Sequence, residues 1–74
     1  MTKENLLVRV TAILLNAIDL YEDGEGKLFT KRYGEAIAIF ELLEEFYGYE
    51  HDNEVVNPIF AKAGRLYDNI KQEY

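Results

Sequence analysis

The sequence predicts an all-α protein, a compact three-helix bundle in which successive helices run up, down and up. Hydrophobic residues recur with helical spacing in three stretches, glycine- or proline-containing turn signals separate those stretches, and no stretch alternates polar and apolar residues as a strand does. We expect helices at about residues 3–22, 30–47 and 58–73 within a single helical domain, residues 1–74. At 74 residues and 49% hydrophobic content, the chain is too short for two cores and too apolar for disorder.

The first helix is expected to follow Thr2, a favourable N-cap residue, and to end before the turn Asp23-Gly24-Glu25-Gly26. Its hydrophobic residues cover more of its circumference than two neighbouring helices can bury. Beyond the core-facing side, Val8, Leu15 and Ile18 form a second apolar seam. Two interpretations of this seam are open: loop residues cover it, or it is the interface of a homodimer or another complex.

The second helix is expected to begin near Thr30, as its N-cap, and to run to Tyr47. Gly48 follows, and glycine is the residue that most often adopts the left-handed conformation that ends a helix. The helical spacing predicts that Leu42 and Phe46 point toward the core.

The third helix is expected to start at Asn57-Pro58, because asparagine is a good N-cap and proline is favoured at the first helical position. Its apolar stripe is narrow, which is typical of an outer helix packed on two neighbours. Leu66 and Ile70 lie on this stripe and are predicted to be core residues.

The residue inventory excludes several kinds of chemistry. The chain contains no Cys and no Ser, so it has no disulfide, no thiolate zinc site and no serine or cysteine nucleophile. The one histidine, His51, is either an exposed loop residue or part of a weak divalent-ion site with the carboxylates around it. We predict that the protein is not an enzyme and has no catalytic residues, no metal and no cofactor.

The N-terminal stretch predicts neither a signal peptide nor a membrane span. Glu4 and Arg9 interrupt the region that would have to be basic and then continuously apolar. The chain is therefore expected to be soluble and cytoplasmic, with no membrane contact.

Charge is unevenly distributed along the chain, whose formal net charge is −6. Residues 33–61 contain seven acidic residues and no Lys or Arg. Glu44 and Glu45 lie in the last turn of the second helix, where the helix dipole disfavours negative charge. Folding stability does not favour acids there, so these residues either keep the protein soluble or bind a basic partner.

Tyrosine residues are interleaved with these acids. Tyr47 and Tyr49 either close the end of the bundle or contact a partner, since tyrosine is a common interface anchor. The predicted partner-binding surface consists of Glu41, Glu44, Glu45, Tyr47, Tyr49, Glu50, Asp52 and Glu54.

These observations favour a non-enzymatic protein-binding module whose partner is a protein with a basic surface. One form of this hypothesis is a small acidic inhibitor that occupies the basic, nucleic-acid-binding surface of its target. Direct nucleic-acid binding is disfavoured by the sign of the charge. The alternative is a structural or assembly subunit that forms oligomers through the apolar first helix.

Overall fold

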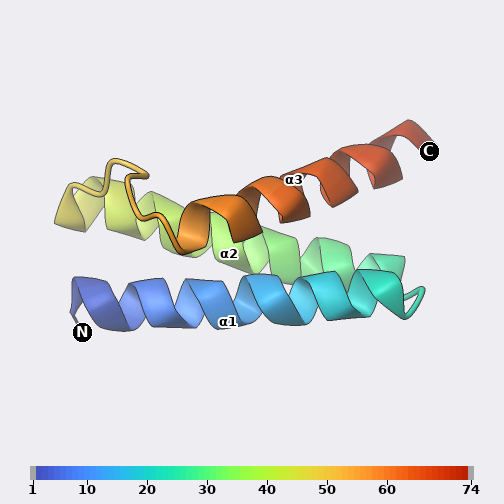
Figure 1. The fold of residues 1–74 in the computed structure, drawn as a ribbon, viewed down its shortest axis with the longest axis horizontal. Helices are drawn as coiled ribbons and strands as arrows, with labels where there is room; N and C mark the ends of the chain where they lie inside the picture. The colour runs from blue at the N-terminus through green and yellow to red at the C-terminus, as the bar shows by residue number, and fades with distance from the viewer. Residues whose placement is uncertain (1, 74) are drawn as a thin grey trace.

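The structure is a computed structural model that describes residues 2–73, and within that range the chain forms three α-helices and no strand. The helices are α1 (Lys3–Glu22), α2 (Gly26–Tyr47) and α3 (Val56–Glu73). α1 and α2 form an antiparallel hairpin, and α3 runs in the same direction as α1 on one side of that hairpin (Figure 1). The predicted all-α three-helix bundle is confirmed.

The core lies along the hairpin and beneath the first half of α3. Its fully buried members include Val10 and Leu14 from α1, Ala36 and Leu43 from α2, and Ala63 from α3. Because Ala63 is both small and fully buried, the backbone of α3 can pack near the hairpin at this position. The second half of α3 diverges from the other two helices (Figure 1).

Aromatic rings span the wider space between α2 and α3. The Tyr33 ring stacks on Tyr67 with 4.7 Å between ring centroids, and the Phe40 and Phe60 rings are 4.4 Å apart. Such ring pairs bury large apolar areas and add a geometric preference of their own. They therefore hold the outer helix where backbone contacts alone would be sparse.

Four of the six predicted helix bounds are confirmed: α1 begins at Lys3 and ends at Glu22, α2 ends at Tyr47, and α3 ends at Glu73. The Thr2 hydroxyl accepts a hydrogen bond from the Asn5 amide at 3.1 Å, which caps α1. Gly48 ends α2 in the left-handed region, at φ 63°.

Both other helix starts differ from the prediction. α2 begins one turn early, and Thr30 lies inside it, where its hydroxyl donates to the Gly26 carbonyl at 2.9 Å. α3 begins at Val56 because the side chain of Asn53, rather than that of Asn57, accepts from the amides of Val55 and Val56, at 2.9 and 3.0 Å. The Asn57 side chain instead donates to the His51 carbonyl at 2.8 Å.

Several side chains also differ from their predicted burial. Ile18 is 5% exposed and belongs to the core, so it is not available on the apolar seam of α1. Phe46 is 69% exposed and Leu42 is 45% exposed, although both were expected to point inward. Leu66 and Ile70 are only half-buried, because the diverging end of α3 leaves the hairpin.

Among the described helices, none has both the length and the hydrophobicity needed to cross a membrane.

Candidate protein-binding surface

The acidic residues predicted to bind a partner lie at the end of α2 and in the connection that follows. Gly48 turns the chain out of the helix, so the connection folds back beside the last turns of α2 (Figure 1). All six carboxylate side chains are exposed. We call them the acidic surface: Glu41, Glu44, Glu45, Glu50, Asp52 and Glu54.

His51 lies in the connection, and its side chain contacts residues of α2. Its Nε2 lies 3.3 Å from Glu44 Oε2, and its ring centroid is 4.7 Å from that of Tyr49 and 5.2 Å from that of Phe40. Its backbone adopts φ 57°, which is uncommon for a residue other than glycine. These contacts fix the connection against α2, so the helix and loop carboxylates form one surface. The sequence did not indicate this role for His51.

Metal binding has no support in this arrangement. Within residues 2–73, no three or more His, Asp or Glu side chains are grouped as a metal site requires. The chemistry that exposed carboxylates offer here is attraction and hydrogen bonding to cationic groups.

Tyr49 closes the end of the bundle. It is only 4% exposed, its ring centroid is 6.0 Å from that of Phe40, and the Lys3 ammonium lies 5.8 Å from its ring centroid. Its hydroxyl is buried and makes no hydrogen bond within the described part of the chain. Burial raises the pKa of Tyr49, and nearby Asp52 raises it further, while the Asn53 backbone opposes the shift. Tyr49 is therefore a packing residue rather than an exposed anchor.

The exposed aromatic residues at this end are Phe46 and Tyr47, at 69% and 38% exposure. From the sequence, Phe46 was expected to be buried, although its position in the helix is compatible with either burial or exposure. The signal that could have identified it as a surface residue is its spacing from Leu42 and Ile39, which places all three on one strip of α2.

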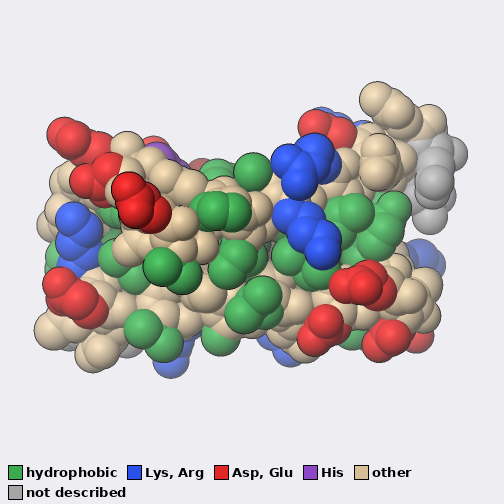
Figure 2. All heavy atoms as spheres, viewed as in Figure 1, with side chains coloured by type: hydrophobic (Ala, Val, Ile, Leu, Met, Phe, Trp, Pro, Cys, Tyr) green, Lys and Arg blue, Asp and Glu red, His purple; other side chains and the backbone are tan. Residues whose placement is uncertain are grey.

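Figure 2 shows acidic side chains at the end of the molecule where α2 gives way to its connection, with a basic side chain close by. Lys3, at the start of α1, reaches this end and lies beside Tyr49. The six carboxylates of the acidic surface nevertheless outnumber this ammonium group, so the electrostatic potential at this end is negative.

The apolar seam of α1 is reduced to two of its three predicted members. Val8 is 70% exposed and Leu15 is 49% exposed, and both line a groove of about 350 Å³ with Val55 and Val56 from the start of α3. Figure 2 shows hydrophobic side chains along this boundary between α1 and α3. Val55 adds to the exposed apolar surface, at 69% exposure, and does not cover the seam.

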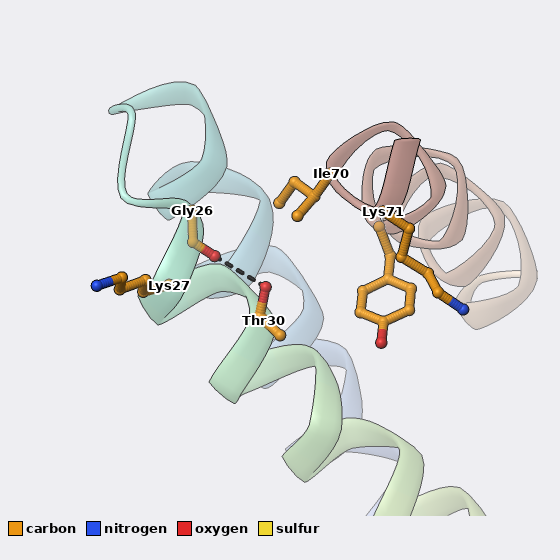
Figure 3. Close-up of a pocket in the computed structure, with 6 residues that line it drawn as sticks. Gly26, Lys27, Thr30, Ile70 and Lys71 are labelled. Carbon is orange, nitrogen blue, oxygen red and sulfur yellow. Dashed lines mark hydrogen bonds between the residues drawn. The ribbon is translucent and has the colours of Figure 1, made fainter. Parts of the chain in front are cut away.

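A second groove, of about 600 Å³, lies at the opposite end of the bundle, between the start of α2 and the diverging end of α3. In Figure 3, Ile70 points toward Gly26 across this groove, while Lys27 and Lys71 lie on its two sides. A Cβ atom at Gly26 would meet Ile70 at 3.8 Å, an ordinary van der Waals distance. None of the predicted binding residues lies in this groove.

Comparison of the chain with protein-family models, with curated proteins and with solved structures finds no significant match.

Proposed function

We propose that this protein is a non-enzymatic binding module whose acidic surface docks on a basic surface of a partner protein. The observation that carries the proposal is that helix and loop carboxylates are joined into one exposed surface through the contact between His51 and Glu44, at 3.3 Å. The partly exposed ring of Tyr47 lies at the same end of α2. Carboxylates supply attraction over distance, and an aromatic ring supplies apolar area on contact.

The placement of charge supports an interaction role. Glu44 and Glu45 lie at the negative end of the α2 dipole, and no basic side chain occupies the last turn of that helix. These acids therefore oppose helix stability. A binding function gives a physical reason for charges that folding disfavours.

A specific form of this function is inhibition of a nucleic-acid-binding protein. A surface that binds phosphates is lined with Lys and Arg, and closely spaced carboxylates can occupy it in place of phosphates. The partner that fits this chemistry is a protein with a basic groove. In this form the module blocks nucleic acid from that groove without binding nucleic acid itself.

The test is affinity capture from the native cell with two variants of equal charge. Glu50→Gln/Asp52→Asn removes two carboxylates from the acidic surface, and Asp19→Asn/Glu22→Gln removes two from the end of α1, where they are also exposed. At low salt, we expect the wild type and the second variant to retain a partner that the first variant loses. High salt should release that partner from the wild type and from the second variant. Equal capture by the two variants would refute the proposal.

A second candidate function is that of an assembly subunit that forms oligomers through α1. The exposed side chains of Val8 and Leu15, continuous with Val55, favour it. An apolar interface of this kind is insensitive to salt, unlike the acidic surface. Leu15→Glu would then convert an oligomer into a folded monomer, as measured by sedimentation and far-ultraviolet circular dichroism.

A further inference from the structure

A second apolar strip lies on α2, away from both the groove of α1 and the acidic loop. Its positions are separated alternately by four and three residues, which is the spacing of a helix–helix seam. We call it the outer face of α2: Leu28, Arg32, Glu35, Ile39, Leu42 and Phe46.

The outer face lies on the side of the hairpin opposite α3. α2 meets α3 through Tyr33 and Phe40, whose rings stack on Tyr67 and Phe60. Phe46 is roughly 120° around the helix from Phe40 at 100° per residue, and this rotation turns it away from α3. Exposures of 47% for Leu28, 45% for Leu42 and 69% for Phe46 show that the described part of the chain leaves these three apolar side chains largely uncovered, while Ile39 between them is half-buried.

Charge along α2 is polarised beside this face. On the flank of this face, Lys31 lies near the start of α2 and Glu45 near its end, whereas Glu44 lies on the other side of the helix, where it contacts His51. A second copy of α2 in the antiparallel direction would place Lys31 of each helix near Glu45 of the other. A parallel copy would place like charges together.

We propose that two copies of this chain pair through the outer faces of α2, antiparallel and related by a two-fold axis near Ala38. Such an interface is isologous, so every contact occurs twice. Across the apolar strip, the pairs are Leu28 with Phe46 of the second copy, Arg32 with Leu42, and Glu35 with Ile39.

The flank of the strip fixes the register. Lys31 and Glu45 lie on the same flank, with Ala38 halfway between them. Residues on one flank face each other across an antiparallel helix pair, so Lys31 of each copy lies opposite Glu45 of the other. Ala38 is small and exposed, which allows close approach at the axis.

The strip contains two charged residues, Arg32 and Glu35, and these compensate each other within one helix. Arg32 Nη1 lies 2.8 Å from Glu35 Oε2 in the same helix, so the two charges enter the interface as a pair.

The test uses charge reversal on purified protein, so its outcome does not depend on any partner or on the proposed function. In a homodimer of Lys31→Glu, two acidic side chains face each other at both of the symmetric contacts, and in a homodimer of Glu45→Lys two basic side chains do. Mixing the two variants restores both attractive pairs in a heterodimer. Both side chains are exposed, so both variants should keep the helical signal of the wild type.

We expect the wild type to be a dimer in sedimentation equilibrium at about 100 μM, where a micromolar Kd gives mostly dimer. Each variant alone should dimerise at least about tenfold more weakly, and the equimolar mixture should return close to wild-type affinity. Leu42→Glu should give a monomer, and Leu15→Glu should leave the dimer intact.

Three results would overturn the proposal. A monomeric wild type at this concentration means that the outer face is not an interface between copies. Single variants that still dimerise like the wild type exclude the antiparallel register. A dimer abolished by Leu15→Glu, with no recovery in the mixture of charge variants, assigns the interface to α1.

Discussion

Replacing Tyr49 by Phe should stabilise the protein. The substitution keeps the ring that packs 6.0 Å from Phe40 and 4.7 Å from His51, and it removes a buried hydroxyl that has no hydrogen-bond partner within residues 2–73. A buried polar group without a partner costs about 1–3 kcal/mol. We expect the free energy of unfolding to rise by about 1 kcal/mol, which corresponds to about 4–8 °C in Tm for a domain of this size.

The assay is urea unfolding at pH 7, followed by circular dichroism. Tyr67→Phe is the matched control, because it removes a hydroxyl from a half-exposed ring and should change the free energy of unfolding by less than about 0.5 kcal/mol. If Tyr49→Phe instead destabilises the protein, the hydroxyl makes a favourable bond, for which the Asn53 backbone beside it is the first candidate.

The same substitution changes the response to alkaline pH. Because burial raises the pKa of Tyr49 above its ordinary value of 10.0, the folded state holds the phenol proton more tightly than the unfolded state does. Stability is therefore full below pH 10.0 and falls as the pH rises through the higher pKa of the folded state. Tyr49→Phe should reduce this loss of stability at alkaline pH. The part of the loss that remains comes from Tyr33, because burial raises the pKa of Tyr33 as well. Urea titrations on both sides of pH 10 measure it, and an unchanged alkaline loss would contradict the assignment.

Further substitutions test the packing and the helix ends by the same unfolding measurement. Leu14→Ala empties a fully buried site and should cost about 2–5 kcal/mol, while half-buried Leu66→Ala should cost clearly less; equal costs would contradict the divergence of α3. Gly48→Ala should cost about 1 kcal/mol, because its φ of 63° strains any residue with a Cβ. Gly34→Ala, inside α2 with open space around it, should gain about 0.5–1 kcal/mol; a loss would show a close contact there. Glu45→Gln removes a negative charge from the end of α2, so stability should hold or rise slightly.

Local signals predicted the helix ends where no second residue offered the same signal nearby, and the end of α1 at Glu22, before the turn with two glycines, was also predicted. Thr2 and Gly48 behave as expected, since no competing cap lies near either of them. At the start of α3, Asn53 and Asn57 both have the right chemistry, and the geometry of the connection selects Asn53. α2 extends back to Gly26 because the chain reverses at Gly24, at φ 82°, before the predicted cap.

Burial at the end of α2 depended on information that helical spacing does not contain. α2 is apolar over more than half of its circumference, and the positions of α1 and α3 together decide which part is covered. The rings of α3 cover Phe40 and leave Phe46 exposed. Tyr49 is buried because the chain folds back after Gly48 and is fixed there through His51. The acidic residues themselves were predictable, since each is exposed as a charged side chain normally is.

The central claim, that the acidic surface binds a basic partner, is tested most directly by the salt dependence of the association rate. The protein captured by the wild type is immobilised, and association is measured between low and physiological ionic strength. Glu50→Gln/Asp52→Asn should associate more slowly than Asp19→Asn/Glu22→Gln and with a shallower dependence on salt, because electrostatic steering acts through the charges nearest the interface. The same rate and salt dependence for both variants would contradict the claim and leave the acidic surface with no part in binding.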